Sequence, residues 1–319
     1  MSVLRKMMMW SAIAIAVVVM AGPAYAADKV SFMLDWYPNP DHAPIYVSQQ
    51  KGYFADQGIA LDIMVPADPN DPLKLVAAGK VDLAISYQPS VTMARSEGLP
   101  VVSIGSLVQH PLSSILYLKS SGIKTPADFK GKKIGYSVEP LYRVLFEAVA
   151  ENASLKKTDY EAFRVGFNLV PPLLTGKIDA AVGAFRNVEA IQVELEGHPA
   201  GVFAFEDFGV PDFYELVIIA NPDTLKKRPQ VIASFMKALT KGINAIEADP
   251  QASLVDFLKA LPDLNDDLNK KSFLATVPFF KGCPHQDPAR WTALQTFMKD
   301  RGLIEKVTPV DEMMVVVGE

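Results

Sequence analysis

The fold is decided by the stretch Leu75-Val-Ala-Ala-Gly-Lys-Val-Asp-Leu-Ala-Ile85, in which an apolar helical segment stops at Gly79 and a strand-like run follows. The same pattern returns at Leu173-Leu-Thr-Gly-Lys-Ile-Asp-Ala-Ala-Val182, with Gly176 at the equivalent point. Each copy predicts a helix, a glycine that ends it with positive φ, and a strand. A pattern repeated at the separation between Gly79 and Gly176 predicts two lobes of similar build. The Lys and Asp of each copy are expected to be turn residues.

Short β-rich runs alternate with helical segments around the first copy. We expect strands over 29–34, 60–65 and 81–86, and helices over 41–54 and 71–79. Strands that alternate with helices predict an α/β fold, with parallel-dominated sheets flanked by helices. The C-terminal third is expected to form amphipathic helices that pack on the first lobe, over 228–248, 251–260 and 288–301.

Two crossings between the lobes are expected. The first is at the apolar run Ser113–Leu118, and the return is at Glu215–Ala220, just before an Asn-Pro turn. These positions divide the chain into lobe 1 at 27–115 and 221–319, and lobe 2 at 116–220. Two crossings predict a cleft between the lobes and a hinge made of two strands.

The N-terminus is typical of a secretory signal peptide. Arg5 and Lys6 precede an apolar run that ends in Ala24-Tyr-Ala26, so we expect residues 1–26 to be removed. The alternative is an anchor that stays attached, but small residues follow the apolar run at once. Since no cysteine follows the run, a lipid anchor is not expected. The mature chain is therefore expected to work in the periplasm.

Composition excludes several function classes. The net charge is −5, and Lys and Arg form no long cluster, which argues against nucleic acid and anionic membranes as partners. Cys283 is the only cysteine, so no intrachain disulfide forms, and it has no suitably spaced basic partner for nucleophilic catalysis. The four histidines show no metal-ligand spacing. We expect no catalytic residues, no metal and no cofactor.

One block carries a family resemblance. The run Leu34-Asp-Trp-Tyr-Pro-Asn-x-x-His42, followed by Lys51-Gly-Tyr-Phe54 and the first glycine turn, resembles the substrate-binding proteins of ABC importers for thiamine-pyrimidine precursors. It equally resembles the fungal enzyme that makes this pyrimidine. The likeness covers roughly residues 30–260 and implies a two-lobed periplasmic binding protein of type II. The block at 34–42 is fairly specific, whereas the Gly-Lys-Val-Asp turns are common among periplasmic binding proteins.

Departures from the pattern separate the two relatives. The resemblance implies a Lys for pyridoxal phosphate and a consumed His in the fungal enzymes, and these positions are Ser86 and Ser90 here. Their cysteine-rich iron-binding run corresponds to residues 210–214, which contain no cysteine. A Schiff base needs an amine and iron needs soft or basic ligands. The sequence therefore predicts a binding protein rather than an enzyme.

A pyrimidine is flat, so its pocket needs aromatic walls and a few polar groups that read its edge. In lobe 1 we expect a stacking wall at Trp36, a polar contact at Asn39, a donor at His42 and a second wall at Tyr87. Each has a structural alternative. Trp36 could be a core residue, Asn39 a turn former, His42 a helix cap and Tyr87 a cover over the hinge.

Lobe 2 offers candidates at the ends of its strands and in the return crossing. Glu189 is the candidate that reads the pyrimidine edge, as the resemblance implies for this segment, and a solvated acid at a helix start is the alternative. Arg186 is expected to pair with Glu189 or to close the lobes. The remaining candidates are a helix-start contact, an opposite wall, a weaker polar group and a cap over the cleft: Ser137, Tyr142, Asn168 and Tyr214.

The expected function is capture of a small heteroaromatic solute in the interlobe cleft and its delivery to an ABC permease by a monomeric protein. A thiamine pyrimidine precursor is the favoured ligand, and a flavin or a sulfonate-type solute is the alternative. An exported enzyme and a sensor that presents its ligand state to a membrane receptor remain as alternative functions.

Overall fold

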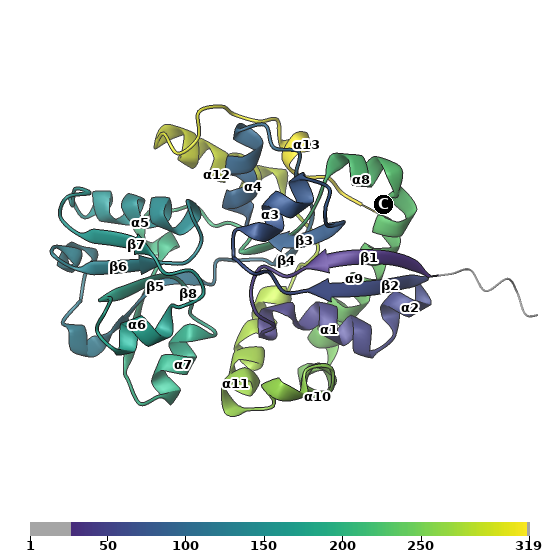
Figure 1. Ribbon diagram of the computed structural model, residues 1–319, viewed down its shortest axis with the longest axis horizontal. Helices are drawn as coiled ribbons and strands as arrows, with labels where there is room; N and C mark the ends of the chain where they lie inside the picture. The colour runs from purple at the N-terminus through teal and green to yellow at the C-terminus, as the bar shows by residue number, and fades with distance from the viewer. Residues whose placement is uncertain (1–26, 318–319) are drawn as a thin grey trace, which may run out of the picture.

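The computed structural model describes residues 27–317, and the predicted signal peptide at 1–26 lies outside the described residues. The chain forms two lobes, each built on one five-stranded sheet, that lie side by side in Figure 1. The fold class is confirmed as α/β with two lobes. Among the described residues, no helix is long and apolar enough to cross a membrane.

The chain builds one lobe, crosses to the other and returns. The first segment contains β1 (Asp28–Met33), η1 (Pro40–His42), α1 (Ala43–Gln50), α2 (Tyr53–Asp56), β2 (Ile59–Met64), α3 (Asp71–Ala77), β3 (Leu83–Ser86), α4 (Gln88–Ser96) and β4 (Val102–Val108). The second contains β5 (Ser113–Leu118), η2 (Lys119–Ser121), η3 (Pro126–Phe129), β6 (Lys133–Tyr136), α5 (Leu141–Asn152), β7 (Glu161–Arg164), α6 (Val170–Leu174), β8 (Ala180–Phe185), α7 (Glu189–Leu195), β9 (Ala200–Ala204) and η4 (Phe205–Phe208). The third contains β10 (Leu216–Ala220), α8 (Pro222–Lys227), α9 (Pro229–Ala248), α10 (Pro250–Ala260), η5 (Pro262–Leu264), α11 (Asp267–Thr276), η6 (Val277–Phe280), α12 (Pro288–Asp300) and α13 (Val310–Met313).

The two sheets have matching topologies. Their strand orders are β2-β1-β3-β10-β4 and β7-β6-β8-β5-β9. In each sheet two ladders are parallel and two are antiparallel, so the sheets are mixed. The antiparallel share exceeds the expectation because each strand that follows a crossing, β5 or β10, enters the new sheet in the reverse direction.

The repeated sequence pattern occupies equivalent places in the two sheets. Gly79 (φ 64°) ends α3 before β3, and Gly176 (φ 69°) ends α6 before β8. Both β3 and β8 are the central strand of their sheet. The sequence echo therefore reflects a structural repeat.

The crossings lie slightly earlier than the predicted lobe boundaries at 115/116 and 220/221. All of β5 pairs with β8 and β9 in the second sheet, and all of β10 pairs with β3 and β4 in the first. The connecting segments are therefore 109–112 and 209–215. The reason is that β5 and β10 are almost wholly buried, and a buried strand must satisfy its backbone within one sheet.

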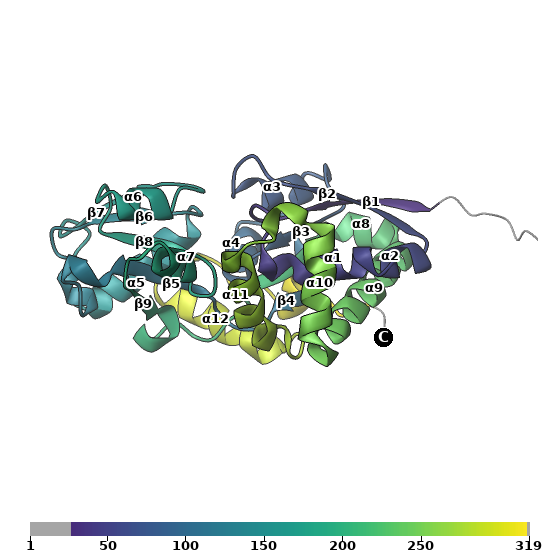
Figure 2. The same ribbon diagram turned by 90° about the horizontal axis from the view of Figure 1, so that it is seen from below.

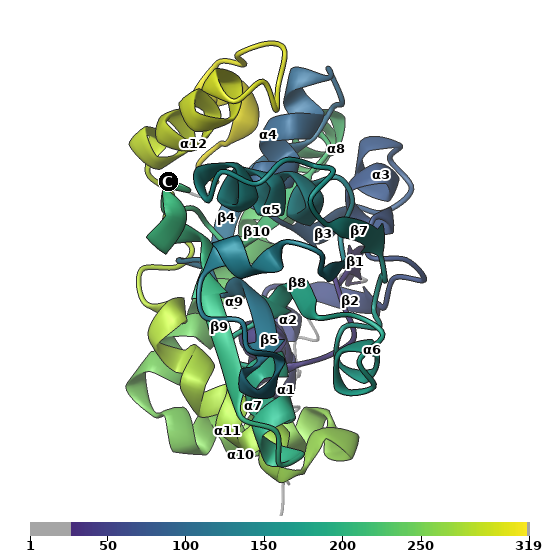
Figure 3. The ribbon, with the colours of Figure 1, turned by 90° about the vertical axis from the view of Figure 1, so that its left-hand side faces the viewer.

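The C-terminal helices pack on the first lobe, as expected. The long helix α9 packs against α1, α2 and β2, and α12 packs against α4 (Figure 2). One element also reaches across, because α11 contacts α7 of the second lobe. Figure 3 views the molecule from the second lobe, with α5 on one face of its sheet and α6 and α7 on the other.

Candidate functional site

A cavity of about 360 Å³, counted out to its mouth, lies between the lobes. It is bordered by segments that follow β1, β3, β6 and β8, which is where α/β sheets bind ligands. Its lining residues are Asp35, Trp36, Asn39, Asp41, His42, Tyr87, Ser137, Tyr142, Gly183, Phe185, Val188, Glu189 and Leu216. Seven of the predicted site residues are among them. Their role in binding stays a prediction.

The first-lobe wall is organised around Asp35, which is 3% exposed. The Asp35 carboxylate accepts hydrogen bonds from Nε2 of His42 at 2.9 Å and from the Tyr87 hydroxyl at 2.8 Å. The other ring nitrogen of His42, Nδ1, accepts from the backbone N–H of Asn39 at 3.3 Å. Both nitrogens are therefore engaged, and His42 holds Asp35 rather than offering a free donor to a ligand.

Asn39 lines the cavity but directs its polar atoms into the turn. Its Oδ1 accepts from the backbone N–H of Asp41 at 2.8 Å, and its Nδ2 donates to the carbonyl of Tyr37 at 3.1 Å. These contacts cap η1. The turn-forming alternative accounts for this side chain in the structure.

The second-lobe wall depends on a glycine that lets two side chains come close. Gly183 has φ 86°, and a Cβ there would lie 2.3 Å from Cδ2 of Tyr142 and 2.5 Å from Oγ of Ser137. The Tyr142 ring is 1% exposed, and its centroid lies 5.9 Å from that of Tyr87 across the cleft. The Ser137 hydroxyl is buried and has no hydrogen-bond partner among the described residues. It is therefore free to contact a ligand.

Two further carboxylates, those of Asp41 and Glu189, make the lining of the cavity acidic. Asp41 accepts from Nδ2 of Asn187 at 2.6 Å and from Thr276, while its Oδ2 is buried without a partner among the described residues. Burial raises the pKa of Asp41 to about 6. Glu189 accepts from the backbone N–H of Phe185 at 2.7 Å, and burial of its carboxylate raises its pKa to about 7.

Among the described residues that line this cavity, none is Lys or Arg. The site combines aromatic faces with carboxylate and hydroxyl oxygens. Such a surface suits a flat ligand that brings hydrogen-bond donors, and it opposes an anionic one.

Contacts between the lobes lie beside the cavity, next to Trp36. Phe167 of the second lobe meets the Trp36 ring edge-on at 4.5 Å and the Tyr37 ring at 4.7 Å between centroids. Arg164 forms an ion pair with Asp68 at 2.6 Å. Trp36 thus lines the cavity and also packs on the opposite lobe, so it is not a first-lobe core residue.

Three predicted site residues do not line this cavity. Asn168 is exposed at the outer rim, beside Arg164 and Tyr37. Arg186 does not pair with Glu189. It forms an ion pair with Glu206 at 2.7 Å, donates to the carbonyl of Pro111 and lies over the Phe279 ring.

Tyr214, the third of these residues, lies beneath the hinge rather than over the cleft. Its hydroxyl accepts from the backbone N–H of Asp287 at 2.6 Å, and the Arg290 guanidinium lies 4.4 Å from its ring centroid. These contacts bind the return crossing to α12. Local sequence could not reveal them, because they join segments that are far apart in the chain.

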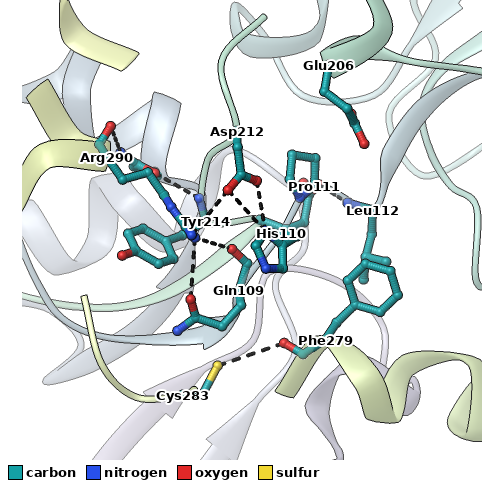
Figure 4. Close-up of polar contacts among 12 residues, drawn as sticks. Gln109, His110, Pro111, Leu112, Glu206, Asp212, Tyr214, Phe279, Cys283 and Arg290 are labelled. Carbon is teal, nitrogen blue, oxygen red and sulfur yellow. Dashed lines mark hydrogen bonds and ion pairs between the residues drawn. The ribbon is translucent and has the colours of Figure 1, made fainter. Parts of the chain in front are cut away.

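The same helix holds the first crossing, as Figure 4 shows. Arg290 donates to the carbonyl of Gln109 at 2.5 Å and pairs with Asp212 at 3.1 Å. His110 lies 2.9 Å from Asp212, so the two crossings are also joined directly. Cys283 lies nearby, and burial raises its thiol pKa to about 12, which disfavours the reactive thiolate.

Several site residues were missed by the sequence reasoning. Asp35 directly precedes Trp36 and Asp41 directly precedes His42 in the diagnostic block, and acids next to expected site residues are the signal that could have found them. Glu215 is another, since it is fully buried and adjoins Leu216 of the lining. Its only sequence signal is an acid placed directly before an apolar strand.

Comparisons with known proteins agree with this architecture. The family model described as NMT1/THI5 like matches residues 39–253. A thiamine biosynthesis protein of Haemophilus influenzae is 41% identical, with 92% of this chain and 93% of the relative covered. A formylaminopyrimidine-binding protein of Halalkalibacterium halodurans is 38% identical, with 72% and 69% covered.

A fungal enzyme is also among the relatives. A 4-amino-5-hydroxymethyl-2-methylpyrimidine phosphate synthase of Saccharomyces cerevisiae is 33% identical, with 86% of this chain and 83% of the enzyme covered. Among solved structures, the alkanesulfonate-binding protein of Xanthomonas axonopodis pv. citri matches with a TM-score of 0.70 at 15% identity, over 92% of this chain and all of that one. At that identity the likeness shows the periplasmic binding protein fold alone.

Proposed function

The chain belongs to the NMT1/THI5-like family, and from this premise we propose that it is a solute-binding protein for a thiamine pyrimidine precursor. The solute is held between the lobes, and the closed form delivers it to an ABC permease in the inner membrane. The observation that carries the proposal is the interlobe cavity, where aromatic rings and unpartnered oxygens meet without a lining cation among the described residues.

The proposed ligand matches the cavity chemically. The rings of Trp36 and Tyr142 provide apolar walls for a flat heterocycle, and Glu189 provides an acceptor for an exocyclic amine. The name of the Halalkalibacterium relative, a formylaminopyrimidine-binding protein, supports the same class. A sulfonate is disfavoured, because burying it beside Asp41 and Glu189 would bring like charges together.

The proposal includes a binding role without catalysis. Ser86 and Ser90 have neither the amine for a Schiff base nor an imidazole. We expect no adduct with pyridoxal phosphate after borohydride reduction, measured by intact mass. A stoichiometric adduct would contradict this part of the proposal and favour the synthase relatives. A sensor would use the same cleft. The two roles, uptake and sensing, are distinguished by whether solute uptake depends on this protein.

We further propose export to the periplasm, since the basic and apolar pattern before Ala26 is typical of a signal peptide. Mature protein from its host is expected to begin within about two residues of Ala27. N-terminal sequencing that finds Met1 on the working protein would contradict this expectation.

The central experiment measures ligand binding. Addition of 4-amino-5-hydroxymethyl-2-methylpyrimidine is expected to raise the melting temperature, because a ligand bound to the folded state alone stabilises by about 2.7 kcal/mol at a hundredfold excess over Kd. Glu189→Gln is expected to reduce this shift, and Glu161→Gln, an exposed carboxylate on β7, serves as the control. The absence of any shift with pyrimidines would refute the ligand, and a shift with flavins would redirect it.

A further inference from the structure

The side chain of Asn187, in the second lobe, forms hydrogen bonds with two residues of the first lobe. Asn187 lies between β8 and α7, and its Nδ2 donates to Oδ1 of Asp41 in η1 and to the hydroxyl of Thr276 at the end of α11, both at 2.6 Å. Asp41 and Thr276 are fully buried, and Asn187 is 3% exposed. These hydrogen bonds exist only while the two lobes are in contact.

The chemistry of the three groups determines which end of the amide faces the first lobe. An ionised Asp41 carboxylate only accepts hydrogen bonds, so Asn187 presents its NH2 group to it. The Thr276 hydroxyl donates to the carbonyl of Ser272 at 2.8 Å, which leaves its oxygen to accept from the same NH2 group. Both N–H bonds of the Asn187 amide are therefore used on the first lobe.

Asp41 needs this amide when the lobes are closed. Asp41 borders the interlobe cavity, so closure removes water from its carboxylate. Its Oδ2 has no partner among the described residues, and its Oδ1 lies 2.6 Å from the Asn187 amide and 3.2 Å from the Thr276 hydroxyl. A buried carboxylate that loses a donor is costly. Without Asn187, the closed form would carry this cost and the open form would be favoured.

A second polar contact between the lobes is weaker. Arg164 and Asp68 form an ion pair at 2.6 Å, but their side chains are 37% and 40% exposed. Solvent screening and side-chain entropy offset most of the attraction in such a pair. A buried hydrogen bond to a carboxylate is screened less and is stronger. The Asn187 amide should therefore hold the lobes together more firmly than this ion pair.

We propose that Asn187 is a closure latch, a positioning residue that acts on the solute through lobe closure and not by direct contact. The inference rests on the proposed function, because closure serves solute capture. Asn187 precedes Glu189 by two residues, and the Glu189 carboxylate accepts from the backbone N–H of Phe185, so one short segment carries the latch and the proposed ligand acid. The latch contains no solute atom, so it favours the closed form of the free protein as well.

The first test measures lobe separation. Nitroxide labels are placed at Asp62→Cys in β2 and Glu161→Cys in β7, which are exposed positions in opposite lobes, and electron–electron resonance gives the distances between them. Native Cys283 is buried with a thiol pKa raised to about 12, so it should not be labelled. Asn187→Ala is expected to increase the population of longer distances, with and without solute. Arg164→Gln is the control and should keep the wild-type distribution.

Asn187→Asp is the second variant, because it preserves size and shape. At about pH 8 the carboxylate that it introduces faces that of Asp41, and like charges repel. We expect it to open the lobes more than Asn187→Ala does. Melting temperatures establish that each variant folds, and the isosteric variant decides the matter if the alanine variant does not fold.

The second test measures binding kinetics. Stopped-flow fluorescence with 4-amino-5-hydroxymethyl-2-methylpyrimidine is expected to show that Asn187→Ala speeds solute release about tenfold or more, the factor for losing a buried hydrogen bond to a charged group. The association rate should change by less than about threefold, since entry precedes closure. Arg164→Gln should speed release by less than about fivefold.

The outcomes separate the latch from the proposed function. If the wild type binds the pyrimidine and neither Asn187 variant lengthens the label distances, the latch is refuted and the proposed function stands. Weaker binding with unchanged distances also refutes the latch, because Asn187 would then act on the cavity wall alone. If the wild type binds no pyrimidine, the proposed ligand falls, and the label distances of the free protein still decide for or against the latch.

Discussion

The hydroxyl of Tyr142 lies 3.2 Å from Oε1 of Glu215, and this contact joins a wall of the interlobe cavity to the segment that returns to the first lobe. The other carboxylate oxygen of Glu215 accepts from the backbone N–H groups of Leu112 and Ser113, at 2.6 and 2.8 Å, and from the Ser113 hydroxyl. One buried acid in the return crossing therefore binds the end of the first crossing, β5 and helix α5. A ligand that packs on Tyr142 acts on a side chain that holds the hinge.

Tyr142→Phe tests this connection. The change keeps the ring and removes one donor to Glu215, so the free energy of unfolding is expected to fall by about 1–3 kcal/mol. Denaturant unfolding measures it, and Tyr117→Phe, whose ring packs on Phe203 in the second lobe, is the control. Equal stability of the Tyr142 variant and the wild type would show that the contact does not support the hinge.

Ser137→Ala is expected to weaken ligand binding without loss of stability. The Ser137 hydroxyl is buried and unpartnered among the described residues, so its removal relieves an unsatisfied group in the free protein. Binding is expected to weaken by roughly 0.5–1.5 kcal/mol, measured by calorimetry. Ser114→Ala provides the contrast, because the Ser114 hydroxyl donates to the carbonyl of Ala184 at 2.8 Å and its loss should cost stability instead. Unchanged affinity of the Ser137 variant would exclude this contact with the ligand.

Trp36→Ala is expected to weaken binding by roughly 1–3 kcal/mol, because the ring is both a cavity wall and a contact to Phe167. An aromatic ligand should also quench the fluorescence of Trp36. Trp291, the other tryptophan of the described residues, is buried beside Tyr214 and should respond little. Tyr37→Ala separates the two effects, since Tyr37 also contacts Phe167 but does not line the cavity. If both variants weaken binding equally, the shared contact with Phe167 of the second lobe rather than stacking on the ligand explains the loss.

Stability of the unliganded protein is expected to fall as pH rises from about 5 to about 8. Burial raises the pKa of Glu215 from 4.5 to about 7, and burial likewise raises those of Asp41 and Glu189. The folded state therefore holds more protons than the unfolded state in this range, and the free energy of unfolding decreases with pH. For Glu215 alone the change is on the order of 3 kcal/mol. Urea unfolding across this range measures the slope.

The slope should become shallower in Glu215→Gln, because the variant cannot titrate at this position. Glu161→Gln, on the exposed strand β7, should keep the wild-type slope. A stability that rises with pH through this range would show that these carboxylates are ionised in the folded protein at low pH.

Much of the architecture follows from local sequence. The two glycine turns at Gly79 and Gly176 predict the repeated helix-to-strand unit. A glycine readily adopts the positive φ that ends a helix, and this preference depends on that residue alone. The block at 34–42 also predicts a cleft segment. Its internal contacts, from Asn39 to His42 and from His42 to Asp35, join residues within one short turn.

The sequence by itself thus determined the α/β class, the two lobes and the segment around Trp36 that borders the cavity. Only the tertiary structure decided that β5 and β10 lie wholly in their new sheets, that Arg186 and Tyr214 serve the hinge, and that Asn168 stays outside. It also brought Ser137 and Tyr142 against Gly183. The physical reason is the sequence separation between the residues that interact. Helix ends and turns are set by backbone preferences over a few residues. The direction and the partner of a side chain in a cleft, by contrast, depend on segments more than a hundred residues apart in the sequence. Gln88 and Tyr214 are 126 residues apart, and Asp41 and Asn187 are 146 residues apart.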